Sequence, residues 1–131
     1  MDRVAELGSI GALYNLGVGY DEGDGVEKDK AKAVELWTKA AMQGGVESRH
    51  NLGSYEMEKG NCDRALKHFL ISAKLGYKDS LEMIKRMFMS GLSTRDQYAE
   101  TLKGYQDAVE EMKSHDRDEA DALRKYRGSS A

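Results

Sequence analysis

One unit of this sequence recurs 32 residues after it first appears, and this repetition limits the possible folds more than any other feature. The offset relates pairs of the same or a similar residue type: Asp29 and Asn61, Ala33 and Ala65, Trp37 and Phe69, Ala41 and Ala73, and Gly44 and Gly76. Self-similarity at a period of roughly 20 to 50 residues is the signature of repeat architectures. The chain is therefore predicted to consist of stacked copies of one supersecondary unit.

Each copy carries a helix with a single apolar stripe. In the first copy Ala33, Trp37, Ala40 and Ala41 fall at the i, i+4, i+7, i+8 spacing of one helical face. The 131 residues include no proline, which favours helices over sheets. We therefore predict an all-α fold in which Trp37 and Phe69 are the large rings of the core.

Glycines and capping residues divide the chain into helices. The predicted helices cover residues 9–22, 30–43, 46–59, 62–75 and 78–90, and a longer helix follows a capping box at 94–97. Ser9, Asp29 and Asn61 are the predicted N-caps of three of these helices. Residues 1–8 are predicted to end an earlier helix at Gly8, and Val26 is predicted to be an apolar plug in the turn before Asp29.

Several helix faces are predicted to be packed. Gly17 lies within a helix and recurs as Gly53, 36 residues later, so we expect a neighbouring helix to approach both glycines closely. Three further sets share a helical face: Leu13, Leu16 and Tyr20; Leu81, Ile84 and Phe88; and Tyr98, Leu102, Tyr105, Val109 and Met112. The cluster of Met83, Met87 and Met89 has two interpretations, core or adaptable binding surface.

Composition limits the class of protein. The length fits one domain with a core of its own, and a net charge of −3 gives no footprint for nucleic acid. No stretch has the apolar length of a signal peptide or a spanning helix, which predicts a soluble protein without a membrane partner. The lone Cys62 fits a reducing compartment, so we expect the cytoplasm.

The first copy carries a specific motif. Its residue types follow in the order Leu16-Gly17, Tyr20, Gly23, Gly25-Val26, Asp29, Lys32-Ala33, Trp37 and Lys39-Ala40-Ala41. This order resembles the Sel-one-like repeat, which belongs to the tetratricopeptide-like helical repeat superfamily. The second copy departs from the motif, because Glu56 stands at the tyrosine position, Phe69 replaces the tryptophan and the turn is shorter.

The resemblance implies an α-solenoid of about three stacked helix-turn-helix repeats with a long C-terminal capping helix. The expected repeats are residues 9–45, 46–77 and 78–113, in a domain over residues 1–113. Residues 114–131 are expected to form a charged helical extension that ends in a disordered tail over residues 128–131. The resemblance also implies a scaffold or adaptor role, although fold alone does not fix function.

No chemical motif in the sequence points to catalysis. The acidic loop over residues 21–29 lacks the ligand order and closing glutamate of a calcium-binding EF-hand. His50, Cys62 and His68 match no zinc spacing, and Gly23 and Gly25 do not form a P-loop. We therefore predict that the protein is not an enzyme and uses no metal or cofactor.

Protein recognition remains as the predicted function. In such a solenoid the first helix of each repeat, here the A helix, lines the concave face. The candidate residues for binding a peptide or partner helix there are Tyr14, Asn15, Arg49, His50, Asn51 and Tyr55. Asn15 and Asn51 are equivalent, and they either clamp a peptide backbone or satisfy groups of their own chain. Alternatively, the chain is a structural segment of a longer array or assembly that self-associates through its repeat ends.

Overall fold

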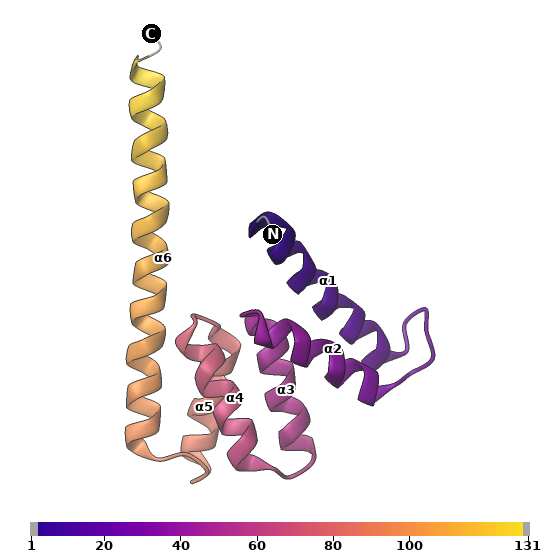
Figure 1. Ribbon diagram of the computed structural model, residues 1–131. Coiled ribbons are helices and arrows are strands. Elements are labelled where there is room, and N and C mark those ends of the chain that lie inside the picture. Colours follow the sequence, from indigo (N-terminus) through magenta and orange to yellow (C-terminus); the bar gives the residue numbers. More distant parts are fainter. Residues whose placement is uncertain (1–2, 130–131) are drawn as a thin grey trace.

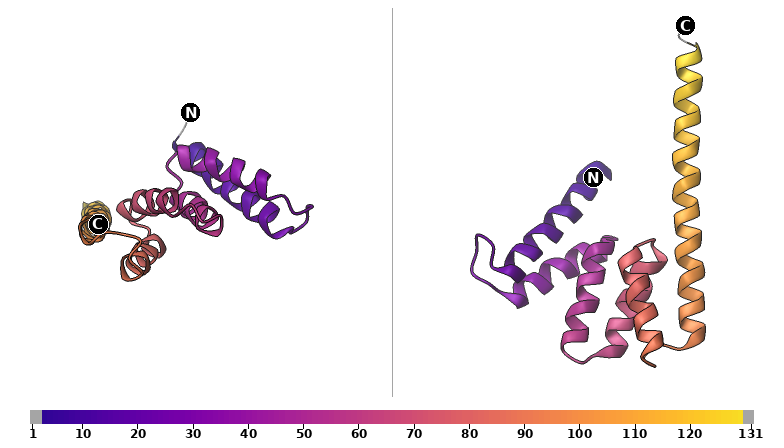
Figure 2. Two further views of the ribbon diagram at one scale, coloured as in Figure 1. Left: turned by 90° about the horizontal axis from the view of Figure 1, so that it is seen from below. Right: turned by 180° about the vertical axis from the view of Figure 1, so that it is seen from behind.

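The computed structural model describes the backbone of residues 3–129 and the side chains of residues 9–127. All the elements it describes are helices: α1 (Arg3–Glu22), α2 (Lys30–Met42), α3 (Val46–Glu58), α4 (Cys62–Lys74), α5 (Lys78–Met89) and α6 (Arg95–Ser129). Each helix from α1 to α5 packs against the next, and α6 packs against both α4 and α5. The three hairpins thus follow one another in a row, with α6 projecting beyond the others (Figures 1 and 2). The predicted all-α solenoid is confirmed.

Two predicted helix starts have the expected capping chemistry. The Asp29 carboxylate accepts a hydrogen bond of 3.1 Å from the backbone N–H of Lys32, which closes the first turn of α2. Before α6, the Gln97 N–H donates to the Thr94 hydroxyl at 3.1 Å, and the Thr94 N–H donates to the Gln97 side chain at 2.8 Å. Gly44 and Gly76 follow α2 and α4 with φ values of 94° and 99°, which glycine adopts without strain.

Four predictions about helix ends and turns are wrong. The backbone of α1 is helical from Arg3 onward, so the helix neither ends at Gly8 nor starts from a cap at Ser9. Asn61 precedes α4 but makes no side-chain cap, and its amide N–H donates to the Glu56 carboxylate at 2.7 Å. Val26 is 38% exposed and therefore does not plug the turn.

The core consists of two clusters that repeat along the row. The first joins Ala33, Trp37 and Ala41 of α2 to Leu52 of α3, with side chains of α1 packed against it. The second joins Ala65, Leu66 and Phe69 of α4 to Ile84 and Met87 of α5. Trp37 and Phe69 are 3% and 0% exposed, which confirms both rings as core.

The methionines do not act as one set. Met87 is part of the second core cluster and Met83 packs against it, whereas Met89 is 75% exposed.

Phe88, which we placed on the apolar face of its helix, is partly exposed and stacks on Tyr98 with ring centroids 5.4 Å apart. This contact helps to hold the first turns of α6 on α5.

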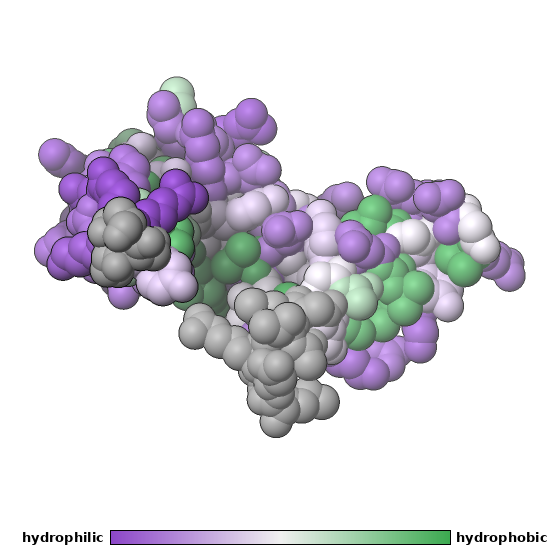
Figure 3. Space-filling model, turned by 90° about the horizontal axis from the view of Figure 1, so that it is seen from above, coloured by the Kyte–Doolittle hydropathy of each residue, from purple (hydrophilic) through white to green (hydrophobic). Residues whose placement is uncertain are grey.

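Leu16 differs from its counterpart in the second repeat. Leu52, 36 residues later, is 6% exposed because it packs against α2, whereas Leu16 is 49% exposed. We expected Leu16 to share an apolar face with Leu13 and Tyr20, but among the described residues no helix precedes α1 to cover it. Apolar surface gathers at this end of the molecule, over the α1–α2 hairpin (Figure 3).

The second half of α6 is exposed on all sides. Every described side chain from Glu110 to Arg127 is exposed. This range includes Met112, which was predicted to lie on the packed face of the helix and is 50% exposed. The helix reaches Ser129, which is beyond the start of the disordered tail predicted for residues 128–131, and residues 130 and 131 lie outside the described residues. Across residues 3–129 no helix combines the length and the apolar character that crossing a membrane requires.

Candidate functional site

The predicted binding residues come from two helices in matching positions. Tyr14 and Asn15 lie on α1, and the other four, Arg49, His50, Asn51 and Tyr55, lie on α3. An offset of 36 residues carries Tyr14 onto His50 and Asn15 onto Asn51, because α1 and α3 are the A helices of successive repeats. The structure therefore allows each residue to be compared with its equivalent.

His50 is held within the protein. Its Nδ1 and the Ser80 hydroxyl of α5 share a hydrogen bond of 2.7 Å. The imidazole also contacts the Phe69 and Tyr77 rings, at centroid distances of 5.1 and 5.3 Å. Burial lowers the pKa of His50, although the nearby Asp79 carboxylate acts in the opposite direction. His50 thus fixes α3 relative to α5.

Arg49 and Tyr55 also have partners in their own chain. The Arg49 guanidinium donates to the carbonyl oxygen of Ala41 at 3.3 Å. The Tyr55 hydroxyl accepts a hydrogen bond of 2.9 Å from Lys59, whose ammonium lies 4.8 Å from the centre of the Tyr55 ring. Both side chains are half-buried and help to shape the surface around α3.

Asn15 and Asn51 differ from these residues. Asn15 is exposed and Asn51 is half-buried, and the structure gives neither side chain a hydrogen-bond partner among residues 9–127. Each amide offers one acceptor and two donor hydrogens. The donors and acceptors of these two equivalent amides are therefore unused within the described part of the chain.

Tyr14 contacts both the core and a small cavity. Its carbonyl oxygen accepts a hydrogen bond of 3.3 Å from the Trp37 indole N–H, and its side chain packs against the first core cluster. The same residue also lines a small cavity between α1 and the start of α3. Ser48 also lines this cavity. It was not predicted as a site residue, although its recurrence as Ser80 is visible in the sequence.

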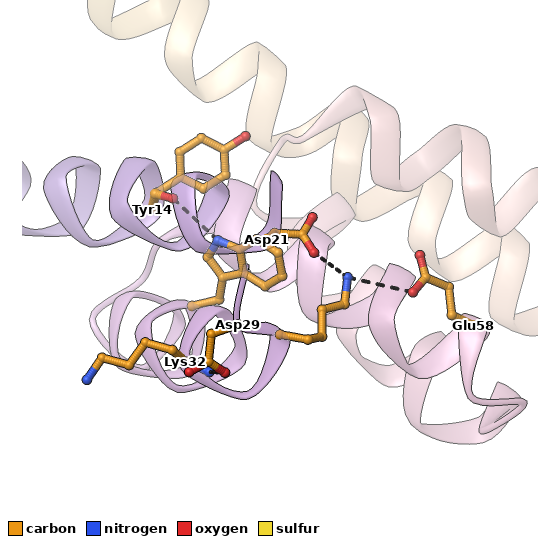
Figure 4. Close-up of polar contacts among 7 residues, drawn as sticks. Tyr14, Asp21, Asp29, Lys32 and Glu58 are labelled. Atoms are coloured by element: carbon orange, nitrogen blue, oxygen red, sulfur yellow. Dashed lines mark hydrogen bonds and ion pairs between the residues drawn. The ribbon is translucent and has the colours of Figure 1, made fainter. Parts of the chain in front are cut away.

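Lys30 is a second residue that the sequence analysis missed. Its ammonium lies 2.5 Å from the Asp21 carboxylate of α1 and 3.7 Å from the Glu58 carboxylate of α3 (Figure 4). It also lies 5.9 Å from the ring centres of Trp37 and Tyr55. The hydrogen bond to Asp21 is the main cause that raises the pKa of Lys30. Lys30 therefore links three successive helices and has a structural role.

The residue types that bind metals do not cluster in the part of the chain that the structure describes. Within this part, no three His, Cys, Asp or Glu side chains come together as a metal site requires. Burial lowers the pKa of His68, and Arg49 lowers it further, whereas Glu56 raises it. Cys62 is half-buried at the start of α4.

Comparison with known proteins places this arrangement in a family. Residues 10–45 and 46–77, just over half of the chain, match the model of the Sel1 repeat. Over 91 residues the chain is 34% identical to a putative sel1-like repeat-containing protein of Acanthamoeba polyphaga mimivirus. The match covers 70% of this chain but 17% of that protein.

Two solved structures are similar in fold. One is c5321, a protective antigen of uropathogenic Escherichia coli strains with an SLR fold; it is 32% identical, with a TM-score of 0.62, over 83% of this chain and 24% of that one. The other is a Sel1 repeat protein from Oxalobacter formigenes; it is 29% identical, with a TM-score of 0.63, over 84% of this chain and 45% of that one. The chain thus spans less than half the length of these relatives. By its repeats and its fold, the chain belongs to the Sel1 repeat family.

Proposed function

We propose that the chain is a non-catalytic scaffold or adaptor that binds a peptide or a partner helix on the concave face formed by its A helices. Sel1 repeats generally mediate interactions between proteins, which supports the class of function. The observation that carries the proposal is the pair Asn15 and Asn51, whose amides are equivalent and have no partner among the described residues. The proposal assigns the repeats to residues 1–113 and a charged extension to residues 114–131.

The chemistry of the amide suits a peptide backbone. A side-chain amide donates to a carbonyl oxygen and accepts from an N–H group, so one asparagine can satisfy both polar groups of an extended peptide residue. A second asparagine on the next A helix repeats this contact further along the peptide. Recognition would then depend on shape and a few polar anchors. Because the lone Cys62 fits a reducing compartment, the proposal places this binding in the cytoplasm.

The other predicted residues support the surface. His50 is bonded to Ser80, Arg49 to the Ala41 carbonyl and Tyr55 to Lys59. The bonds of His50 and Arg49 hold α3 against α5 and α2, and the bond between Tyr55 and Lys59 lies at the end of α3 itself. A ligand would therefore meet a surface that is largely formed before it binds. Preorganisation of this kind reduces the entropy that binding costs.

Peptide selection tests the proposal directly. Peptides that bind are selected from a random display library on the wild-type protein, and their Kd is measured by fluorescence anisotropy. The double variant Asn15→Ala/Asn51→Ala should weaken binding at least about tenfold, because each lost hydrogen bond is worth about 1 kcal/mol. Asn61→Ala is the matched control, since the Asn61 amide bonds Glu56. Unchanged binding by a folded double variant would show that these asparagines are not the anchors.

Leu16 favours a second candidate function, a structural segment that stacks through its end face. Its equivalent Leu52 is covered by the preceding B helix, so the 49% exposed Leu16 offers the same contact to a helix of another repeat or another chain. Multi-angle light scattering should then detect association that Leu16→Lys removes and Met42→Lys, at another exposed site of the same hairpin, retains. A wild-type monomer at high concentration would argue against this candidate.

A further inference from the structure

Acidic and basic side chains are divided between the two kinds of helix in the first two repeats. Residues 9–22 of α1 include two acidic side chains and no basic one, and α3 has three acidic and one basic. The second or B helices, α2 and α4, each have three basic side chains and one acidic. The A helices, which form the proposed binding face, are therefore negatively charged, whereas the B helices are positively charged.

Three of the acidic residues share a helix face with the two asparagines. Glu22 follows Asn15 by seven residues, which is two helical turns or about 10 Å along the same face. Glu58 follows Asn51 by the same interval, and Glu47 precedes it by one turn. The offset of 36 residues that relates the asparagines also relates Glu22 to Glu58. The repeat thus places a carboxylate at the same distance from each asparagine.

These carboxylates have few cations of their own chain to pair with. Glu22 and Glu47 are exposed, and neither forms an ion pair with a side chain that the structure describes. The Glu58 side chain is 66% exposed and lies 3.7 Å from the ammonium of Lys30, which is closer to Asp21, at 2.5 Å (Figure 4). The exposed face of the A helices therefore carries carboxylates that are left to a partner.

The cations at this face are held by other groups. Arg49 is the one basic residue of α3, and its guanidinium donates to the carbonyl oxygen of Ala41. Lys59, just after α3, donates to the Tyr55 hydroxyl, and its ammonium lies 4.8 Å from the centre of that ring. Neither side chain forms a salt bridge with Glu47 in the described part of the chain.

This pattern is confined to the first two repeats. α5 has Asp79 at the position of Glu47, 32 residues later, but Met83 stands in place of Asn51. In total α5 has three basic and two acidic side chains. Asparagines and carboxylates therefore occur together on α1 and α3, the two helices that carry the proposed binding residues.

We propose that the peptide bound across Asn15 and Asn51 is basic, and that its lysine or arginine side chains pair with Glu22, Glu47 and Glu58. The inference rests on the proposed function and adds the chemical class of the partner. Lysine and arginine have long side chains, so they can reach a carboxylate one or two turns away while the peptide backbone stays at the asparagine. Complementary charge also speeds association and disfavours acidic peptides.

The composition of selected peptides is the first test. Peptides selected on the wild-type protein from the random display library should be richer in lysine and arginine, and poorer in aspartate and glutamate, than the unselected library. Their Kd should rise several-fold when the salt concentration is raised from about 0.05 to 0.5 M, because exposed ion pairs are screened. Selected peptides without an excess of basic residues would overturn the proposal.

Neutral glutamine variants locate the effect. Glu22→Gln/Glu47→Gln/Glu58→Gln should weaken a selected basic peptide about tenfold, because three exposed ion pairs are lost together. Glu22→Gln/Glu47→Gln should cause a smaller loss of about threefold to fivefold, and it keeps the contact between Glu58 and Lys30. Circular dichroism checks that both proteins stay helical. Unchanged binding by the folded triple variant would overturn the proposal.

A matched control separates these positions from net charge. Asp107→Asn/Glu110→Gln/Glu111→Gln removes three negative charges at exposed positions of α6 and should leave the Kd within about twofold of the wild type. Equal weakening by the two triple variants would mean that only net charge matters, which would overturn the proposal.

Pentalysine tests the same surface without a selected peptide. It is added to labelled protein at low ionic strength while amide shifts are recorded by NMR, with pentaglutamate as the control. We expect shifts centred on residues 19–22 and 47–58 with pentalysine and none there with pentaglutamate. Shifts on α6 alone, or equal shifts with both probes, would overturn the proposal.

The asparagine variant distinguishes failure of this inference from failure of the proposed function. Selected peptides that depend on Asn15 and Asn51 but are not basic, and that bind the triple glutamine variant normally, would keep the proposed function and overturn this inference. Basic peptides that respond to the glutamine variants but bind Asn15→Ala/Asn51→Ala normally would support recognition by the carboxylates and overturn the asparagine anchors.

Discussion

Gly17 and Trp37 pack so closely that a Cβ atom on Gly17 would lie 2.6 Å from Cδ1 of the indole. The second repeat has the same relationship, since a Cβ atom on Gly53 would lie 2.7 Å from Cε1 of Phe69. Real Cβ atoms essentially never come so close to another heavy atom. The A helices of the first two repeats, α1 and α3, therefore carry a glycine because the ring of the following B helix occupies the space beside it.

Alanine at either glycine should destabilise the protein. Gly17→Ala and Gly53→Ala should each lower the free energy of unfolding by about 1 to 3 kcal/mol, as expected when a core is overpacked. Gly11→Ala is the control, because it has open space and gains up to about 1 kcal/mol of helix propensity. Urea denaturation followed by circular dichroism measures all three, and a stabilised Gly17→Ala would contradict the packing argument.

Removing the ring itself should cost more. Trp37 is 3% exposed within the first core cluster, so Trp37→Ala should lower the free energy of unfolding by about 3 to 5 kcal/mol through lost burial and a residual cavity. Met42→Ala, at a 78% exposed position of the same helix, should change it by less than about 0.5 kcal/mol. Chemical denaturation of the two variants gives the comparison, and a loss below about 1 kcal/mol for Trp37→Ala would place the ring outside the core.

Much of the fold was predictable because its signals are local or periodic. Asp29 and the Thr94–Gln97 box determine their helix starts by bonds within one turn, and the sequence shows such bonds directly. The recurrence of Trp37 as Phe69 marks the core, because every repeat must bury the same stripe. Apart from the Asn61 cap, the errors concern Gly8, Ser9, Val26 and Leu16. Whether a helix continues or a side chain is covered there depends on neighbouring elements that local sequence does not specify.

The candidate site was predictable only in part. Equivalence of Asn15 and Asn51 follows from the repeat register, and so does the pairing of Ser48 with Ser80. The sequence did not show that His50 is bonded to Ser80 while Ser48 is left unpaired, since both facts depend on how rings from three helices fill the spaces between repeats. Contacts across repeat boundaries join residues about 30 positions apart. The sequence pattern alone does not show which of these residues touch.

The two equivalent serines should respond differently to alanine. Ser80→Ala removes the partner of the half-buried His50 Nδ1 and should lower the free energy of unfolding by about 1 kcal/mol. Ser48→Ala removes a buried hydroxyl that has no partner among the described residues, so it should be neutral or stabilising. Both values come from urea denaturation in the absence of peptide. Equal destabilisation by the two substitutions would mean that Ser48 is bonded in solution.

Acidification should destabilise the protein through His50 and His68. Burial lowers the pKa of both rings from the ordinary value of about 6.5, so at mildly acidic pH the unfolded chain binds protons that the folded chain does not. The free energy of unfolding should therefore be largest above about pH 6.5 and fall as the pH drops from there toward the pKa values of the folded protein. Denaturation curves between about pH 7.5 and 5 cover this window, which lies above the ordinary titration of carboxylates.

Histidine substitutions separate the contribution of His50 and His68 to the pH dependence from that of other titrating groups. His50→Gln/His68→Gln should flatten the dependence of stability on pH in that window, even if its stability at pH 7.5 is lower, because the two groups that gain protons on unfolding are gone. His115→Gln, which changes an exposed side chain of α6, should keep the wild-type slope. If the double variant retains the full slope, the two buried rings are not its source, and NMR titration of the histidine side chains would then identify the group that is.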